Sequence, residues 1–457
     1  MPVSFMPQQI LDLHIHSKYS RACSKDLELP KIAAACQTRG VDIVATGDFT
    51  HHKWFEHIKE SLVEVGDLGI FKLNNQDTRN KIQTITNYQL PITKFIIGTE
   101  LAVIKKHKGE TRRIHVNVFA PNLAVVEKFN QKLESGGFNL RSDGRPILGL
   151  TVKELLQIML EIDERMIMIP AHAWTPWFGI FGSKGGYNSL EEAFDELAPK
   201  VFAIETGLSS DPLMNWRLSK LDNIALVSNS DAHSLEKIGR EANVLQFENE
   251  KEITYDNIFK IIKEKNKNNF LYTIEFYPEE GKYHFDGHRD CKFVCAPEET
   301  KKLKGLCPKC KKPLVIGVMN RVSELADRSE EEALRLTSLA PLGLSSGRRQ
   351  SKRVPYKSMV PLPEIIADAL AMGVKTKAVQ TEYNNLIKKF GSEFNILLKT
   401  PVAEIKTASQ KIIGEAVERV RNGKIYIQPG YDGEFGVVKV FGEKEKRGGL
   451  RQTGLNL

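Results

Sequence analysis

The amino-acid sequence predicts an α/β protein that begins with a barrel of seven β/α repeats. Short apolar runs alternate with helical patterns up to about residue 270, four of the six cysteines then cluster between Cys291 and Cys310, and amphipathic stretches follow. The cluster predicts a small metal-binding module, and the amphipathic stretches predict a mostly helical C-terminal region. We place the units at 1–275, 276–320 and 321–441, with a flexible tail over 442–457.

Seven β-type runs supply the strands of this barrel: ILDLHIH, VDIVATGD, KFIIGTE, RIHVNVF, RMIMIPAH, VFAIET and NIALVSNSDAH. Helix candidates lie between them. LPKIAAACQTRG should end at Gly40, and TVKELLQIMLEID should begin at a capping box of Thr151 and Glu154. Seven repeats favour a closed barrel, although an open doubly wound sheet would show the same alternation. In the last unit, KIYIQPGYDGEFGVVKVF predicts a β-hairpin.

Composition indicates a cytoplasmic protein. Hydrophobic residues make up 41% of the chain, and no apolar run approaches the roughly 20 residues that a bilayer requires. The first residues show neither a signal nor a transit peptide, so we expect no membrane association. A formal net charge of +8 favours a polyanionic partner, but a mixed lysine and glutamate surface would produce a similar surplus.

Ionisable side chains gather where the predicted strands end. In LDLHIHS, Asp12, His14 and His16 occupy every second position, so they share one face of a strand. The remaining members are Asp48, Glu100, His115, His172, Asp231 and His233. One such histidine alone would more often be a satisfied core residue, but burying so many unpaired ionisable groups would cost several kcal/mol each. Imidazole and carboxylate together suit zinc, iron or manganese, and paired ions support phosphate-ester hydrolysis.

The ordered motifs DLHIHS, TGD, GTE, a strand-end histidine and SDAH resemble the PHP (polymerase and histidinol phosphatase) superfamily over residues 8 to 270. That resemblance implies a distorted (β/α)7 barrel with a trinuclear metal site. It implies the metal ligands His14, His16, Glu100, His115, His172, Asp231 and His233. Where many members have TDH, this sequence has TGDFTHH, so Asp48, His51 or His52 could supply a ligand. In the early loop SRACSKD, Asp26 suits a hydrolytic site better than Cys23, although a surface aspartate is an equal alternative.

Four cysteines, Cys291, Cys295, Cys307 and Cys310, have spacings that fit a tetrahedral structural zinc site. His284 and His288 are lower-ranked substitutes, and a redox pair is the alternative. Lysines surround this module, and Arg348, Arg349 and Arg353 lie in the loop GLSSGRRQSKRVPYK. Such patches could follow a phosphate backbone, or could be solvated surface.

The zinc module followed by GVMNRVSELADR resembles the endonuclease Q family of PHP enzymes, a likeness that extends to about residue 441. It implies cleavage of single- or double-stranded DNA 5′ to deaminated bases (uracil, hypoxanthine, xanthine) and abasic sites by catalytic zinc, with magnesium or manganese as alternatives, and association with the nucleoid. Asp231 is then the candidate that orients or deprotonates the attacking water, with His172 and Glu100 as further catalytic candidates. A small-molecule phosphatase and a non-catalytic DNA-binding protein are the rival functions.

Two further segments have predicted contacts. Trp174, Trp177, Phe178 and Tyr187 follow His172 and could line a pocket for a flipped base, or form a hydrophobic plug over the barrel. The terminal QTGLNL resembles a sliding-clamp-binding peptide through Gln452, Leu455 and Leu457, although a frayed end is the plainer alternative.

Overall fold

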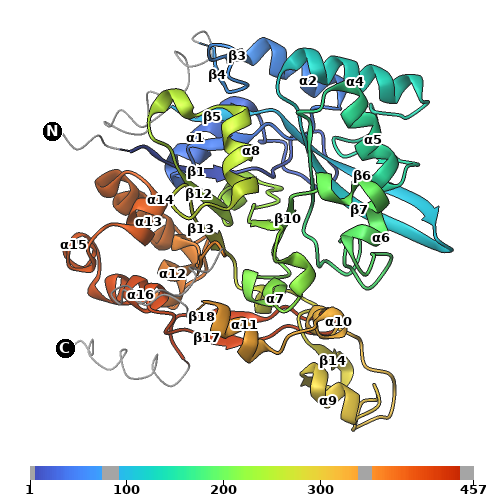
Figure 1. Ribbon diagram of the computed structural model, residues 1–457. Coiled ribbons are helices and arrows are strands. Elements are labelled where there is room, and N and C mark those ends of the chain that lie inside the picture. The colour runs from blue at the N-terminus through green and yellow to red at the C-terminus, as the bar shows by residue number, and fades with distance from the viewer. Residues whose placement is uncertain (1–5, 75–91, 338–352, 443–457) are drawn as a thin grey trace, which may run out of the picture.

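A computed structural model describes residues 6–74, 92–337 and 353–442 (Figure 1). Arg348, Arg349 and the tail with Gln452, Leu455 and Leu457 lie outside the described residues, so the predictions made for them stay predictions. Arg353 is the first residue described after the second internal gap.

An eight-stranded mixed sheet forms the centre of the molecule, with the order β16-β13-β12-β1-β2-β5-β4-β3. Strand β1 pairs in parallel with β2 and antiparallel with β12, while β13 pairs antiparallel with β12 and in parallel with β16. The strands are β1 Gln8–Asp12, β2 Ile43–Ala45, β3 Leu62–Glu64, β4 Phe71–Leu73, β5 Lys94–Ile96, β12 Ala242–Gln246, β13 Phe270–Glu275 and β16 Tyr356–Ser358.

Two smaller sheets carry the remaining strands of the first 275 residues. One has the order β8-β6-β7-β9 and the other pairs β10 with β11. Strands β6 and β7 form a long antiparallel hairpin with ten paired positions. Their bounds are β6 Gly98–His107, β7 Glu110–Phe119, β8 Ile147–Leu148, β9 Ile167–Pro170, β10 Ala203–Glu205 and β11 Ala225–Val227.

The strands surround one core, but their ladders do not join into one sheet among the described residues. Leu11, Ile43, Ile169 and Val227 come from four different strands and belong to the same buried cluster. An isolated parallel bridge between Ile15 and Ala232 links the ends of β1 and β11. The fold is therefore mixed α/β, while closure into a (β/α)7 barrel stays a prediction.

Helices cover the strands, and two of them have the ends that the sequence predicts. Helix α1, Leu29–Arg39, ends at Gly40, whose φ of 92° is the left-handed conformation that favours glycine. Helix α5, Val152–Ile162, begins at the expected capping box of Thr151 and Glu154. The others in this part are α2 His52–Ser61, α4 Leu123–Ser135, α6 Leu190–Phe194, α7 Pro212–Trp216 and α8 Tyr255–Glu264.

The cysteine-bearing segment forms a small module at the lower right of Figure 1. It consists of β14 Asp286–His288, β15 Phe293–Cys295 and α9 Pro297–Lys302. The buried Asp286 accepts hydrogen bonds from Gly317 N (2.6 Å) and Asn320 Nδ2 (2.5 Å), which attach the module to the next helix.

The C-terminal region is mostly helical, as predicted. Its helices are α10 Val318–Leu325, α11 Glu330–Thr337, α12 Leu362–Ala369, α13 Lys377–Phe390, α14 Glu393–Leu398, α15 Val402–Ala408 and α16 Lys411–Arg421. Strands β17 Tyr426–Gln428 and β18 Val437–Lys439 form the expected hairpin. A buried ion pair of Arg39 and Glu393 fastens α14 to α1.

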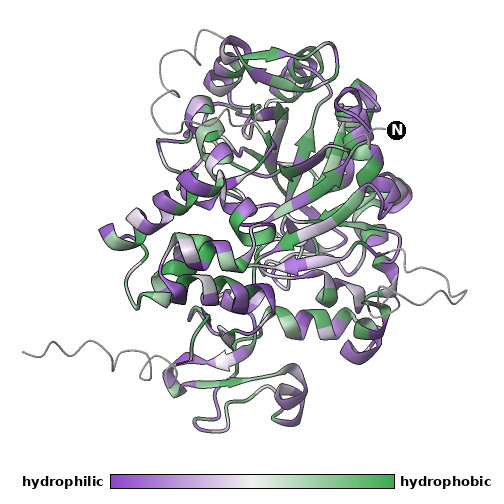
Figure 2. Cartoon of the chain, turned by 90° about the vertical axis from the view of Figure 1, so that its left-hand side faces the viewer, coloured by the Kyte–Doolittle hydropathy of each residue, from purple (hydrophilic) through white to green (hydrophobic). Residues whose placement is uncertain are grey.

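Hydropathy follows this arrangement. Figure 2 shows mostly hydrophobic central strands, whereas the surrounding helices carry both hydrophobic and hydrophilic residues. No helix in the described part of the chain is long and apolar enough to cross a membrane.

Candidate metal centre

Two groups of potential metal ligands meet at one carboxylate. His14, His16, Glu100 and Asp231 form the first group, and Glu100, His115 and His172 form the second. Glu100 Oε1 lies 2.8 Å from His115 Nδ1 and 3.0 Å from His172 Nε2, whereas its Oε2 lies 3.3 Å from His16 Nε2. Each oxygen of Glu100 thus faces a different group, which is the arrangement of a carboxylate that bridges two metal ions.

The β6–β7 hairpin places part of this centre. Glu100 pairs with Asn117 and Ala102 pairs with His115, so these four residues share one face of the hairpin. We predicted Glu100 and His115 at strand ends, and this was wrong because β6 and β7 continue through both positions. Both ligands are nevertheless buried on the inner face.

His14 provides the test of whether a metal fits. Its Nε2 atom is buried and has no hydrogen-bond partner among the described residues, yet it lies 3.4 Å from Asp231 Oδ1 and 3.6 Å from Glu100 Oε2. An imidazole nitrogen that faces two carboxylates without a hydrogen bond is in the position of a metal ligand. The donor set therefore fits divalent metal ions.

The sequence analysis missed Glu205 at the end of β10. Its carboxylate lies 3.0 Å from His14 Nδ1 and accepts hydrogen bonds from Asn117 Nδ2 (2.9 Å) and Asn229 Nδ2 (2.9 Å). It also accepts the backbone N–H of His172 (3.0 Å). Such a carboxylate fixes the tautomer of His14 and aims its other nitrogen at a metal. The run VFAIET contained the signal, because Glu205 ends a strand just as other site residues do.

We predicted Asp48 as a metal ligand, but its carboxylate contacts His16 and Ser17. It lies in neither ligand group, because its Oδ1 faces His16 Nδ1 (3.2 Å) while its Oδ2 accepts from Ser17 N (2.8 Å) and Ser17 Oγ (2.6 Å). Asp48 therefore orients His16. His233 also lies outside both groups, with its Nδ1 on the backbone oxygen of Asp231 (2.8 Å) and its ring 4.6 Å from that of His16.

None of the four alternative ligands belongs to either group in the described part of the chain. Asp26 is 63% exposed and pairs with Lys31 (2.6 Å). His52 is exposed at the start of α2, and His51 stacks on Tyr19 at 4.4 Å. Burial raises the pKa of the Cys23 thiol to about 11, which disfavours the thiolate that would bind a metal.

The charges of the centre depend on one another. Burial opposes protonation of His14, but Glu205, Asp231 and Glu100 outweigh it and raise the pKa of His14 well above its usual value. Burial, together with the charges of His172 and Arg145, lowers the pKa of His115 to about 4 despite the nearby Glu100. The buried carboxylates thus require nearby positive charge to remain ionised, and bound metal ions or protonated histidines would supply it.

Three residues at the centre have a strained backbone conformation. Asp48, His172 and Asp231 have φ of 49°, 29° and 46°, in the left-handed region that residues with a side chain rarely adopt. Gly207 makes room for this turn, because a Cβ there would lie 2.6 Å from the Cβ of His172. Such strained positions persist where the surrounding contacts hold them, as Glu205 holds the amide of His172.

Arg145 is a second residue that sequence analysis missed. Its Nη1 lies 2.8 Å from Glu100 Oε2, and its side chain is partly exposed. A lone arginine in the loop SDGRPIL carries no pattern that marks it in the sequence. Its position places a positive charge beside the bridging carboxylate, where a phosphate group could reach it.

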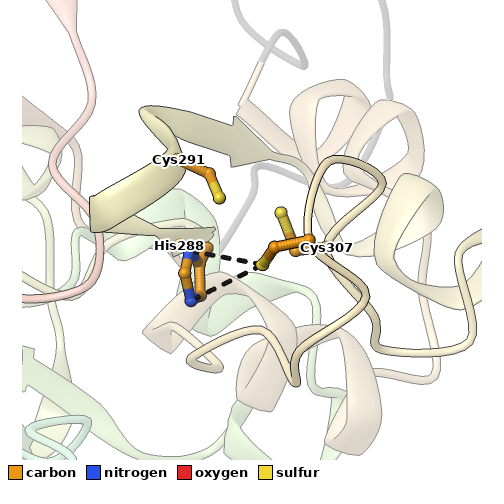
Figure 3. Close-up of side chains that lie close together, drawn as sticks. His288, Cys291 and Cys307 are labelled. Atoms are coloured by element: carbon orange, nitrogen blue, oxygen red, sulfur yellow. Dashed lines mark hydrogen bonds between the residues drawn. The ribbon is translucent and has the colours of Figure 1, made fainter.

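The cysteine module holds a third potential ligand group, composed of His288, Cys291, Cys307 and Cys310. Figure 3 shows His288, Cys291 and Cys307 pointing toward one another. Cys295, which we predicted as a ligand, lies outside this group, and its thiol lies 3.2 Å from Thr300 Oγ1 on α9. His288 is the fourth member of the group, at 3.9 Å from Cys310 Sγ.

Both pairs in this group have two residues between their members, a spacing that suits zinc knuckles. Burial opposes ionisation of Cys307, but hydrogen bonds from the backbone amides of Cys310 and Lys309 lower its pKa. The donor set of three cysteines and one histidine therefore suits a tetrahedral metal ion such as zinc.

The aromatic loop divides into buried and exposed parts. Trp174 is 1% exposed and donates to Asn215 Oδ1 (2.8 Å), and Tyr187 is buried with its hydroxyl 2.9 Å from His107 Nδ1. These two side chains occupy the core, as the alternative of a hydrophobic plug describes. Trp177 is 48% exposed, and Phe178 lies 4.2 Å from the ring of His115.

Arg353 has partners within the chain. Its Nη2 donates to Asp222 Oδ1 (2.7 Å), and its guanidinium lies 5.3 Å from the ring of Trp216. These contacts hold the residue against the body of the protein.

Two solved structures resemble the whole chain. The lesion-specific endonuclease PfuEndoQ from Pyrococcus furiosus aligns over 98% of this chain and 100% of its own, with a TM-score of 0.78 and 29% identity. A complex of endonuclease Q with a 27-mer duplex substrate that has an abasic lesion at the active site aligns over 96% and 98% of the two chains, with a TM-score of 0.76 and 30% identity. The chain belongs to the endonuclease Q family. It is therefore an enzyme of the nuclease class.

Other relatives of this endonuclease Q family member cover shorter parts. The family model described as the MJ0043 C-terminal domain matches residues 361–424, which hold α12 to α16. The uncharacterized protein MJ0043 of Methanocaldococcus jannaschii is 32% identical over 269 residues, or 58% of this chain, and the chain spans 31% of that protein's length.

Proposed function

We propose that this endonuclease Q family member is a DNA repair enzyme that hydrolyses the phosphodiester 5′ to damaged nucleotides. The proposed lesions are uracil, hypoxanthine, xanthine and abasic sites, and the enzyme would act at the nucleoid in the cytoplasm. The observation that carries the proposal is the alignment over 98% of an endonuclease Q chain solved with an abasic duplex. The two ligand groups that share Glu100 support it from the chemistry of the site.

The proposed chemistry uses catalytic zinc, with magnesium or manganese as alternatives, held by the two groups around Glu100. When bound, such ions activate water and neutralise charge on the phosphate. Asp231 is suited to orient that water or accept its proton, because its side chain is 23% exposed while its Oδ1 lies 3.0 Å from His16 Nε2. Arg145 would contact a phosphate oxygen beside Glu100.

Trp177 and Phe178 are the proposed contacts to the damaged nucleotide. Phe178 packs on the ring of His115, and its neighbour Trp177 is 48% exposed, with its ring 5.6 Å from that of Tyr283. An exposed indole there could stack on an unstacked base or fill the gap that the base leaves. In this proposal Trp174 and Tyr187 support the loop from below.

The test uses end-labelled duplexes with one uracil, one hypoxanthine, one abasic site or no lesion, each with Mn²⁺, Mg²⁺ or Zn²⁺. We expect incision of the damaged duplexes only, loss of incision with EDTA, and a 3′-hydroxyl that a DNA polymerase extends. Equal cutting of the undamaged duplex, or no cutting with any metal, would contradict the proposal. Hydrolysis of para-nitrophenyl phosphate in the same buffers, without incision of any damaged duplex, would instead indicate the rival function of a small-molecule phosphatase.

We also propose that the tail residues QTGLNL bind the replication sliding clamp, which would concentrate the enzyme at replicating DNA. The clamp of the same organism would be titrated against the full chain and against a chain ending at Arg451. Equal binding by both, or by neither, would exclude the tail as the contact.

A further inference from the structure

A cavity of about 470 Å³ lies between the eight-stranded sheet and the C-terminal helices. Strand β16 contributes Tyr356, Lys357 and Ser358, the segment after β13 contributes Tyr277, and helix α16 contributes Arg421. Aliphatic side chains from α14 and α16 complete the wall. No residue of the two metal-ligand groups lines it.

The charges of this cavity are of one sign. Its lining includes Lys357 and Arg421 and, among the described residues, no carboxylate, whereas a larger cavity of about 830 Å³ is lined by several, Glu191 and Asp327 among them. Partial desolvation and the charge of Arg421 lower the pKa of Lys357, although both side chains remain exposed to solvent. An anion between them would offset the repulsion of their like charges.

Neutral hydrogen-bond donors lie beside these two cationic side chains. Tyr277, Tyr356 and Ser358 bring three hydroxyl groups to the same lining. Burial raises the pKa of Tyr277 to about 12, so its hydroxyl keeps the proton that it can donate. A phosphodiester offers oxygens that only accept hydrogen bonds, so a lining of ammonium, guanidinium and hydroxyl groups is complementary to it.

Strand directions place this cavity on the same edge as the metal centre. Strands β13 and β16 run parallel to β1, because β12 lies antiparallel to both β1 and β13. His14 and His16 follow β1, while Tyr277 and Ser358 lie at the corresponding ends of β13 and β16. Three strand spacings separate β1 from β16, which corresponds to about 14 Å. Duplex DNA carries a charge about every 1.7 Å along its axis, so a bound duplex has phosphates within that span.

We propose that this cavity binds a backbone phosphate of duplex DNA, apart from the bond that is cleaved. The inference rests on the proposed function and adds a fixed contact that positions the duplex without reading its sequence or its lesion. Lys357, whose Nζ lies 4.2 Å from the centroid of the Tyr272 ring, is the main contact, since Arg421 donates to the backbone oxygens of Leu397 (2.9 Å) and Thr400 (2.7 Å).

The experiment compares Lys357→Ala with Lys411→Ala, which removes an exposed lysine at the start of α16. Binding of an abasic and an undamaged duplex would be measured by fluorescence anisotropy over a range of salt concentrations. One lost phosphate contact should reduce the slope of log K against log salt by about 0.9 on both duplexes. Both variants should keep the wild-type melting temperature.

Three results would overturn the phosphate site. The slope of Lys357→Ala could match that of Lys411→Ala, or the loss could occur only on abasic DNA, which would assign Lys357 to lesion recognition. Tight binding of inorganic phosphate or deoxyadenosine monophosphate that depends on Lys357, with DNA binding unchanged, would assign the cavity to a free nucleotide. Failure of the proposed function is a separate result, since wild-type protein would then leave every damaged duplex intact.

Discussion

Replacing Glu205 by glutamine should weaken metal binding without unfolding the protein. The Glu205 carboxylate accepts from Asn117, Asn229 and the backbone N–H of His172, and it faces His14 Nδ1 at 3.0 Å. Glutamine keeps the shape but has one acceptor oxygen and turns an NH2 group toward donors. His14 would lose the partner that fixes its tautomer, so its Nε2 would no longer be held as an acceptor for metal.

The expected size follows from the position of Glu205 behind one ligand. Loss of a carboxylate that orients a metal-bound histidine typically lowers metal affinity or activity by about 10- to 100-fold, or roughly 1.4 to 2.8 kcal/mol. We expect the Mn²⁺ concentration that gives half-maximal incision of an abasic duplex to rise by about 10- to 100-fold. Calorimetric titration of Mn²⁺ into metal-free protein should show the same ratio.

Glu241 provides a matched control. It is also fully buried, but burial and the charge of Glu275 raise its pKa well above the usual value, which favours its protonated form. Glutamine has nearly the shape of a protonated glutamic acid, and Glu241→Gln should therefore leave the Mn²⁺ dependence unchanged. If the two variants lost metal equally, or if Glu205→Gln behaved as wild type, the role assigned to Glu205 would be refuted.

Four further outcomes are expected. Asp231→Asn should abolish incision while duplex affinity stays near wild type, because the basic surfaces are untouched; measurable turnover would argue against Asp231 in the reaction. His288→Ala should release the zinc of the small module whereas Cys295→Ser should retain it, as metal analysis of the purified variants would show; the reverse pattern would restore Cys295 as a ligand. Arg39→Ala should lower the free energy of unfolding by about 3–5 kcal/mol in urea titrations, because it leaves Glu393 buried without its partner; a loss below about 1 kcal/mol would contradict this. Glu275, whose pKa burial raises from 4.5 to about 8, should make stability fall as pH rises between these values, because the unfolded state releases its proton first; Glu275→Gln should flatten that part of the profile.

Local signals in the sequence predicted local structure well. The capping box at Thr151 and the terminal Gly40 define helix ends through contacts within one or two turns, so no distant residue is needed to recognise them. The β17–β18 hairpin has a similar origin. In each case the residues that determine the conformation are neighbours in the chain.

The β6–β7 hairpin shows why other elements were missed. Lys108 and Gly109, with φ of 52° and 87°, form a two-residue turn between His107 and Glu110. A lysine in the first of these positions is a weak turn signal, so the sequence separated two short runs where the structure has one long ladder. That ladder, which no short run predicts, places Glu100 and His115 on one inner face.

The candidate site was predictable by residue type and much less by role. Polar residues after apolar runs identified the neighbourhood of the centre, but the rule could not separate Asp48, which contacts Ser17 and His16, from Glu100, which faces both groups. Glu205 ends a strand in the same way and was passed over. Which atoms a carboxylate faces depends on chain segments that are far apart in sequence, and a single sequence does not show them.

The two metal regions differ in what the metal does for the fold. Around Glu100, the ligands extend from strands whose apolar residues form extensive buried clusters, so the fold has an apolar core of its own and metal mainly compensates buried charge. The small module has a core of Cys295, Cys307 and Leu314 among its described buried residues, and one of these is a potential metal ligand. So little apolar burial cannot offset the entropy of ordering the segment, and a bound metal ion would contribute folding energy there. Removing metal should therefore abolish catalysis at the first region and unfold the second. Because a chelator acts on both regions, it cannot distinguish loss of catalysis from loss of structure. The variants of His288 and Asp231, which each affect one region, therefore belong in the same experiment.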